Sequence, residues 1–280
     1  MPTTINTNMA SLSAQRALQS TNGSLSTSMQ RLSTGLRINS AKDDAAGLAI
    51  AERMTSQVRG MSVASRNAND GISMAQTAEG ALGKVGESLQ RMRELAVQAR
   101  NGSNSTDDRA NLNKEYQSLS KEVARVVEST SFNQKKLLDN AATEDVTFQV
   151  GAGTDTQDGI KIEFKAEVAG KIDANLTTVK TTEITDDAKA ETAIDELDKL
   201  IDDVTGARSY LGAQQSKFDN VVANLSVASE NVSAARGRIV DADFAVESAN
   251  LSRAQVLSQA GNTMLAQANQ QPQQVMSLLR

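Results

Sequence analysis

The sequence of 280 residues contains no cysteine, no histidine and no tryptophan, and it has only two tyrosines and five phenylalanines. Without cysteine and histidine, the chain cannot form the usual zinc sites, a Ser-His-Asp triad or a Cys-His pair. The few aromatic side chains provide little bulk for a globular interior and suit thin seams between helices. We therefore predict no catalytic, cofactor-binding or metal-binding residues, and we do not expect an enzyme.

One enzymatic alternative stays open, a hydrolase that works with carboxylates such as Asp202-Asp203 or Asp241 and Asp243. That chemistry needs a concave pocket, which long helical assemblies rarely provide. Helix caps and solvated helix faces explain the same acids more simply. In particular, Asp43-Asp44 stands where carboxylates favour the start of a helix, and we interpret it as a cap.

Long hydrophobic runs and an ordinary signal segment are also missing. No stretch of about 18 apolar residues occurs, so no membrane span is predicted. The residues after Met1 contain neither a basic nor an apolar segment, so we do not expect an ordinary secretory signal peptide. The net charge of −5, without a lysine- or arginine-rich block, argues against nucleic acid as a partner. Proline occurs only at Pro2 and Pro272, which permits long helices between them.

The longest regular pattern lies between Met54 and Ala99. Its apolar residues recur about every 3.5 residues, the period that keeps one helical stripe against a partner in a left-handed coiled coil. The stripe comprises Met54, Val58, Met61, Ala64, Ala68, Ile72, Ala75, Ala78, Leu82, Val85, Leu89, Met92, Ala96 and Ala99. It predicts one helix over about residues 44–100, roughly 85 Å long, in a rod-shaped molecule. Three glycines lie inside this helix, Gly80, Gly83 and Gly86. We interpret them as places where a neighbouring helix comes close; the alternative is that the helix merely tolerates them.

Two further segments carry helical stripes. After a polar turn at residues 101–106, apolar residues recur in steps of four and three over residues 107–130, which predicts an antiparallel helical hairpin with the long helix. From Asp186 to Ile239 a third stripe keeps heptad spacing for most of its length. We expect this segment to be the partner of the long helix.

Between these helices the period changes to two. Val146, Phe148 and Val150 alternate with polar residues, and the alternation resumes over residues 160–168. This pattern predicts a β-hairpin with one buried face. Residues 170–185 are expected to form a loop.

Both ends of the chain are poor in charge. Arg16 and Arg31 are the only charged residues among the first 36, and only Arg253 and Arg280 follow Glu247. Large apolar residues at helical spacing predict helices in both segments. The first segment has too few of them to offset the entropy cost of ordering it alone, so it should need a partner. A disordered tail is the alternative, although such tails are usually rich in charge.

The sequence resembles bacterial flagellin. Four stretches carry the resemblance: MASLSAQRALQST at 9–21, QRLSTGLRINSAKDDAAGLAIAERM at 30–54, LQRMRELAVQ at 89–98, and SRAQVLSQAGNTMLAQANQQPQQVMSLLR at 252–280. The similarity extends over roughly residues 1–140 and 190–280. Because little more than the hairpin lies between these regions, the chain resembles a short form that lacks the large outer domains.

The fold class expected is mainly α: a long antiparallel coiled-coil or helical-bundle rod with a small β-hairpin region. The resemblance implies a terminal helical pair, residues 1–43 and 236–280, that forms the filament core. It also implies a helical bundle of the outer tube, residues 44–140 and 186–235. Residues 141–185 are then the hairpin and loop region, with the outer domains absent.

The resemblance further implies a structural subunit that is secreted by the flagellar type III apparatus and self-assembles into the filament for motility. The implied partners are other copies of the chain, a cap protein, a hook-junction protein, an export chaperone at the C-terminal segment and the innate Toll-like receptor for flagellin. The residues implied for receptor binding and subunit contact are Gln90, Arg91, Leu95 and Glu115. Those implied for assembly of the filament core are Leu25, Met29, Leu32, Leu36, Leu257, Met264, Leu278 and Leu279. The nearest alternative is a hook-filament junction protein of the same export system.

Overall fold

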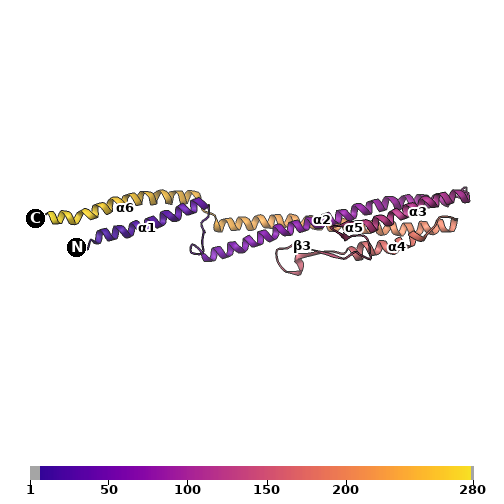
Figure 1. The fold of residues 1–280 in the computed structure, drawn as a ribbon, viewed down its shortest axis with the longest axis horizontal. Helices are drawn as coiled ribbons and strands as arrows, with labels where there is room; N and C mark the ends of the chain where they lie inside the picture. The colour runs from indigo at the N-terminus through magenta and orange to yellow at the C-terminus, as the bar shows by residue number, and fades with distance from the viewer. Residues whose placement is uncertain (1–6, 279–280) are drawn as a thin grey trace. The chain divides into compact units, whose positions relative to one another are not determined.

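The structure is a computed structural model that describes residues 7–278, with side chains as far as residue 270. The helices in this part of the chain are α1 (Met9–Thr34), α2 (Ala45–Ala99), α3 (Thr106–Ser129), α4 (Gly170–Thr181), α5 (Asp187–Val240) and α6 (Phe244–Leu278). The strands are β1 (Ser131–Phe132), β2 (Lys135–Lys136), β3 (Val146–Gln149) and β4 (Gly159–Ile162), with a 3-10 turn η1 (Thr156–Asp158) and a π-helical segment η2 (Phe164–Ala169). The prediction of a mainly helical fold with a small β-hairpin is confirmed (Figure 1).

Contacts divide the chain into two units. The terminal unit consists of the residues up to Ser56 and those from Asn231 onward, and the central unit is Gln57–Glu230. Helices α2 and α5 each contribute to both units. The predicted three-part division of the chain stays a prediction.

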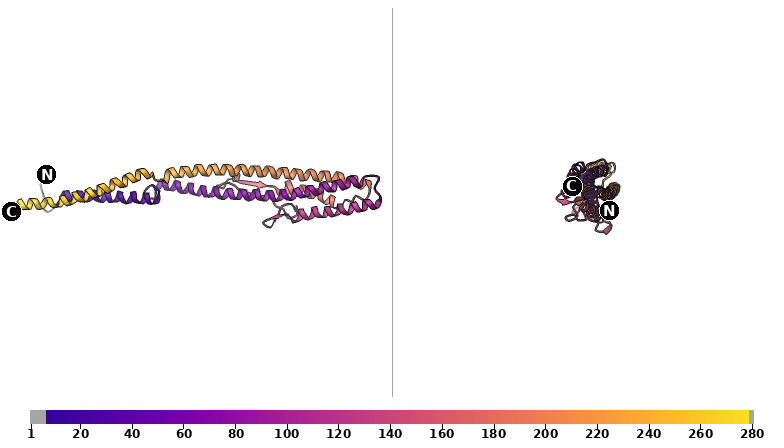
Figure 2. Two further views of the ribbon diagram at one scale, coloured as in Figure 1. Left: turned by 90° about the horizontal axis from the view of Figure 1, so that it is seen from above. Right: turned by 90° about the vertical axis from the view of Figure 1, so that its right-hand side faces the viewer.

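In the terminal unit, α1 and α6 lie side by side and antiparallel (Figures 1 and 2). Asn8 donates from Nδ2 to the carbonyl of Ala268 at 2.8 Å, whereas Ser28, near the other end of α1, binds Glu247. Seven of the eight buried or half-buried positions of α1 repeat in alternating steps of three and four, the spacing of a two-helix seam, and Arg31 is the eighth. The seven are Ser11, Ala14, Leu18, Thr21, Leu25, Ser28 and Leu32. Helix α6 carries a matching row of buried and half-buried residues with the same spacing: Glu247, Leu251, Ala254, Ser258, Gly261, Leu265 and Ala268.

This seam is thin because most of its positions hold small or polar residues. Leu18 packs against Gly261, where an added Cβ would lie only 3.0 Å from Leu18 Cδ1. The leucines of the seam are half-buried rather than buried. Two helices alone cannot surround such side chains, so the terminal pair has little dry core.

The segment between α1 and α2 is held by hydrogen bonds. Arg37 donates from its backbone amide to the carbonyl of Val240 and from Nη2 to that of Ile239, both at 2.6 Å. Asp44 Oδ1 accepts from the amide of Gly47 at 2.8 Å, which confirms that Asp44 caps the long helix. Asp43 accepts instead from Ser40 and Asn39, so it stabilises the preceding turn.

The central unit confirms the predicted seam of the long helix. From Met61 to Ala99 every predicted stripe residue of α2 is buried except Ile72, which is half-buried. Helix α5 runs antiparallel to α2: Arg208 pairs with Glu79, whereas Asp198 pairs with Arg93. The predicted partner of the long helix is therefore correct.

The glycine interpretation was wrong for two positions. An added Cβ would meet nothing within 4 Å at Gly80 or Gly83, and at Gly86 it would make only an ordinary contact with Val204. The close approach occurs instead at Gly71, where an added Cβ would lie 2.9 Å from Phe218 Cζ. Spacing along α2 could not reveal this contact because it depends on which residue of α5 lies opposite.

The hairpin prediction was right at its start and wrong at its end. Strands β3 and β4 are antiparallel, with Val146 opposite Ile162 and Phe148 opposite Ile160. However, the chain leaves the strand after Ile162 and turns into η2 and α4, where a strand and then a loop were expected. The reason is helical spacing: Phe164, Val168, Ile172, Leu176 and Val179 are all buried, while Ala166 is exposed.

Candidate functional site

The terminal unit exposes an unusual number of large apolar side chains. Apart from Ile50 on α2, these side chains lie on α1 and α6, and we call that set the terminal apolar surface: Met9, Leu12, Met29, Phe244, Val246, Val256, Leu257 and Met264. Their exposed fractions run from 41% at Leu12 to 69% at Phe244. They come from α1 and α6 and lie outside the seam between those helices. Large apolar sets of this kind mark surfaces that another molecule covers.

Three of the residues predicted for filament assembly belong to this surface, namely Met29, Leu257 and Met264. Leu25 and Leu32 are half-buried in the seam with α6, so they hold the helix pair together. Leu36 follows α1 and pairs its backbone with Asp241. The backbone of Leu278 ends α6, but its side chain and all of Leu279 lie outside the described residues.

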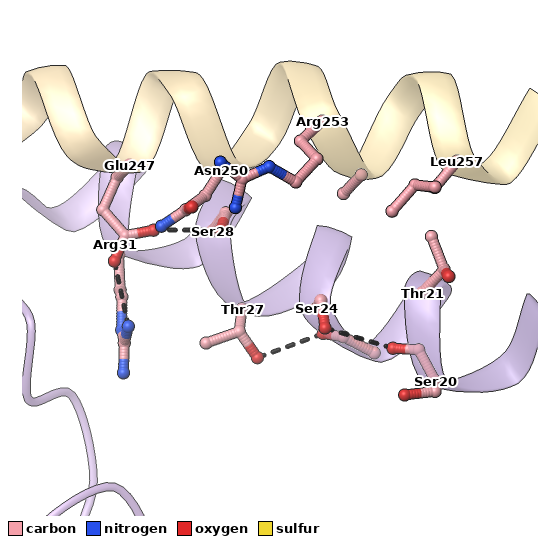
Figure 3. Close-up of a pocket in the computed structure, with 12 residues that line it drawn as sticks. Ser20, Thr21, Ser24, Thr27, Ser28, Arg31, Glu247, Asn250, Arg253 and Leu257 are labelled. Carbon is pink, nitrogen blue, oxygen red and sulfur yellow. Dashed lines mark hydrogen bonds and ion pairs between the residues drawn. The ribbon is translucent and has the colours of Figure 1, made fainter. Parts of the chain in front are cut away.

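A charged cluster lies inside the seam, and the sequence alone did not point to it. Glu247 is 7% exposed; its Oε2 accepts from Ser28 Oγ and its Oε1 from Arg31 Nη1, both at 2.9 Å (Figure 3). Burial raises the pKa of Glu247, but the hydrogen bonds from Arg31 and Ser28 outweigh it, so the pKa lies below its usual value. One sequence feature could have indicated this ion pair: Glu247 is the last acidic residue of the chain, and Arg31 is one of only two charged residues among the first 36.

The same cluster borders a groove between α1 and α6 of about 730 Å³. Its α1 side is lined by hydroxyl groups, those of Ser20, Thr21, Ser24, Thr27 and Ser28. Asn250, Arg253 and Leu257 line its α6 side (Figure 3). The polar lining shows that water, rather than an apolar ligand, suits this groove.

In the central unit, Arg91 and Glu115, two of the residues implied for receptor binding and subunit contact, pair with each other. Arg91 donates from Nε and Nη2 to Glu115 Oε1 at 3.1 and 3.0 Å, and from Nη1 to Glu94 Oε2 at 2.9 Å. The hydrogen bonds of Glu94 and Glu115 raise the pKa of Arg91 above its usual value. All three side chains are about half-exposed or more, so the cluster lies on the surface and joins α2 to α3.

Leu95 does not lie on this surface. It is 1% exposed and belongs to the hydrophobic core, so its side chain cannot contact a partner in this fold. The reason is that α2 packs against both α3 and α5, which widens its buried stripe beyond the seam that spacing predicts. We define the Arg91 surface as Gln90, Arg91, Glu94 and Glu115, all of which are exposed.

Among residues 7–278 there is no group of three or more acidic side chains placed to hold a metal ion. No helix in that range combines the length and apolarity required for crossing a bilayer.

Comparisons with known proteins agree with the two helical regions. The sequence model of the bacterial flagellin N-terminal helical region matches residues 5–143, and that of the C-terminal helical region matches residues 194–279. Flagellin of Halalkalibacterium halodurans is 47% identical over 278 residues, and flagellin of Bacillus subtilis is 41% identical over 305 residues; each alignment covers 99% of both chains.

One solved structure is informative about the fold alone. A putative flagellar hook-associated protein from Vibrio parahaemolyticus aligns with a TM-score of 0.58 at 17% identity, covering 71% of this chain and 100% of that chain. The sequence matches, by contrast, extend over nearly the whole chain at more than 40% identity. The chain therefore belongs to the bacterial flagellin family and is a secreted structural protein, not an enzyme, that self-assembles into the extracellular flagellar filament.

Proposed function

We propose that the terminal apolar surface is the contact through which subunits of this flagellin pack in the filament core. The observation that carries this proposal is the exposure of eight large apolar side chains on α1 and α6 of a single chain. Burying one such side chain contributes about 1.5–3 kcal/mol, so covering even half of the set would favour association strongly. The low charge of both ends fits the same role, because few charges would have to lose water.

The test is seeded polymerisation of the full chain with an exposed core residue made polar. Leu257→Gln should raise the subunit concentration needed for growth about tenfold, because about 1.4 kcal/mol per contact corresponds to that factor. Val63→Gln, at a similarly exposed apolar residue of the central unit, is the matched control. Normal growth of the Leu257 variant would contradict the proposal.

The last residues are proposed to belong to the same contact. The proposal rests on the sequence, because Leu278 and Leu279 form a large apolar pair at a chain end that carries no acid after Glu247. A chain without residues 273–280 should not polymerise, while thermal melting of the central unit should stay unchanged. Filaments of normal length from the truncated chain would exclude this role.

We further propose that the Arg91 surface serves two exclusive partners, a neighbouring subunit in the filament and the innate Toll-like receptor for flagellin on the free chain. The exposure of Gln90, Arg91 and Glu115, and the hydrogen bonds that hold the Arg91 fork in place, support the proposal. A guanidinium held by two carboxylates needs little ordering when a partner binds. Because Leu95 is buried, the proposed contact with either partner involves the exposed polar residues of the Arg91 surface and not Leu95.

Arg91→Ala should reduce both receptor activation and polymerisation, by about 1–3 kcal/mol in each case if the side chain makes a buried charged hydrogen bond. Arg125→Ala is a matched control, because Arg125 is also exposed and pairs with one carboxylate, that of Glu122. Intact filaments should activate the receptor poorly until they dissociate. Full signalling and full polymerisation of the Arg91 variant would show that Arg91 is only a solvated side chain.

The remaining partners are proposed from the family: a cap protein, a hook-junction protein and an export chaperone that covers the C-terminal segment. Exposed Val256, Leu257 and Met264 on α6 support a chaperone, because an unassembled chain presents them to water. The alternative role of a hook-filament junction protein predicts short additions to hook ends without further growth. Long filaments grown from the pure chain would argue against it.

A further inference from the structure

Six of the methionines whose side chains are described fall into two environments. In the terminal unit Met9, Met29 and Met264 are 63%, 53% and 61% exposed. In the central unit Met61, Met74 and Met92 are 8%, 3% and 0% exposed. Among methionines with described side chains, only Met54 is intermediate.

Exposure controls the chemistry of a methionine thioether. Its sulfur can be oxidised to the sulfoxide by a peroxide that reaches it, and the product is polar and chiral rather than apolar and flexible. Methionine is otherwise well suited to an interface, because its unbranched chain adapts to the surface it meets. The three exposed thioethers therefore lie where oxidation would change a contact surface, and the three buried ones lie where it is hindered.

We propose that Met9, Met29 and Met264 are three separate peroxide-sensitive modification sites whose oxidation prevents the free subunit from assembling. The proposal rests on the assembly role proposed above for the terminal apolar surface. The co-reactant is hydrogen peroxide, a two-electron oxidant that a secreted chain can meet outside the cell.

The reaction balances without a further reagent. The sulfur lone pair attacks one oxygen of hydrogen peroxide, an S–O bond forms, and the O–O bond breaks. The departing hydroxide takes the proton from the new S–OH group, which leaves a sulfoxide and one water. Sulfur loses two electrons and the peroxide gains them.

The consequence follows from where the oxygen is placed. Each sulfoxide adds a strong hydrogen-bond acceptor to a face that assembly would remove from water, and an unpaired buried acceptor opposes association. The helix pair itself should persist, because none of the three residues belongs to the seam of Ser11, Leu18, Leu25 and their counterparts. In the filament the same thioethers would be covered. Peroxide should therefore oxidise them in the free subunit and oxidise them much more slowly in the polymer.

The experiment treats the full-length monomer with dilute hydrogen peroxide and follows each methionine by peptide mass spectrometry. Met9, Met29 and Met264 should oxidise about tenfold faster or more than Met61, Met74 and Met92. At the time when only the first three are oxidised, seeded polymerisation should be lost and the melting of the central unit unchanged. Methionine sulfoxide reductases acting on both epimers should restore polymerisation.

Variants separate the three sites from general damage. The chain with Met9→Leu, Met29→Leu and Met264→Leu keeps apolar volume but cannot form the three sulfoxides, so peroxide should leave its polymerisation at the rate measured for the same untreated variant. Met74→Leu is the matched control and should remain as sensitive as the parent. If the triple variant does not polymerise untreated, the three single variants replace it, and each should retain part of the parent's growth after peroxide.

Two outcomes would overturn the proposal: a chain oxidised at the three sites that polymerises like the untreated one, or equal oxidation rates at exposed and buried methionines. The assembly role is tested separately by treating intact filaments. Oxidation of Met29 and Met264 there as fast as in the monomer would contradict that role, even if oxidation is selective in the monomer.

Discussion

The terminal and central units use the same building element, antiparallel helices with heptad-spaced seams, but they differ in how completely the seam excludes water. In the central unit Leu82, Leu89 and Met92 are fully buried. In the terminal unit the seam leucines are half-buried, and Glu247 is buried among them instead. The difference lies in the number of layers: α3, α4 and the β3–β4 hairpin add core residues to the central unit. A two-helix seam thus needs further cover to become a dry core.

The largest expected consequence is a difference in local stability. We expect amide hydrogens of α1 and α6 in a verified monomer to exchange orders of magnitude faster than those of the middle of α2, because opening the terminal pair exposes little buried surface. Hydrogen exchange with mass spectrometry measures this directly. Equally slow exchange in residues 9–34 and in the middle of α2 would show that the two units do not differ in local stability.

A core truncation should give the next largest effect. Leu89→Ala removes a fully buried side chain of the central unit and should lower the free energy of unfolding by about 2–5 kcal/mol. Leu25→Ala changes a half-buried position of the terminal seam and should leave the free energy of unfolding of the central unit unchanged. Urea titrations followed by circular dichroism compare the two variants. An equal loss of central-unit stability in both would mean that the units do not unfold separately.

Acid should loosen the terminal pair through Glu247. Because the native pKa of this carboxyl lies below its unfolded value, its contribution is complete above the unfolded pKa and is lost as the pH falls through the native one. Glu247→Gln should remove this pH dependence and cost about 1–3 kcal/mol of pair stability at neutral pH. Exchange rates in α1 and α6, measured between neutral and acidic pH, report the effect. A variant with the parent's acid response would assign it to other groups.

The smallest expected effects distinguish glycines by their surroundings. Gly80→Ala should stabilise α2 by up to about 1 kcal/mol, since alanine favours helix and the site is open. Gly71→Ala should destabilise by about 1–3 kcal/mol, because its Cβ would press on the Phe218 ring. Thermal melting of both variants measures the opposite signs. Stabilisation by both would show that the Phe218 ring moves away at little cost.

Much of the fold could be predicted because its helices are long and regular. A stripe that repeats over many turns, as from Met61 to Ala99, leaves only one face to bury and so specifies both the helix and its need for a partner. In short elements the spacing of apolar residues does not distinguish a strand from a helix. Over residues 160–168 an alternating pattern and a helical pattern share Ile160, Phe164 and Val168, and only packing distinguished them.

Some features of the two candidate surfaces could likewise be predicted from the sequence, and others could not. The charge-poor ends and their methionines and leucines at helical spacing were visible in the sequence. The resemblance pointed to Arg91 and Glu115 as contact residues, but only the structure shows that the two side chains pair. The burial of Leu95 was not visible in the sequence, because it depends on two helices packing against α2 at once. The position of Glu247 between Ser28 and Arg31 was equally hidden, since those residues lie 219 and 216 positions away in the chain.

The sequence by itself determined the composition that excludes histidine and cysteine chemistry, the period of every long helix and the low charge of both ends, because these are local properties of the chain. Only the tertiary structure decided which residues of α1 face α6 and which remain on the terminal apolar surface. It also decided that Gly71, rather than Gly80 or Gly83, lies against a neighbouring side chain. The physical reason is that burial depends on the register between helices, and register is set by contacts between residues far apart in the sequence.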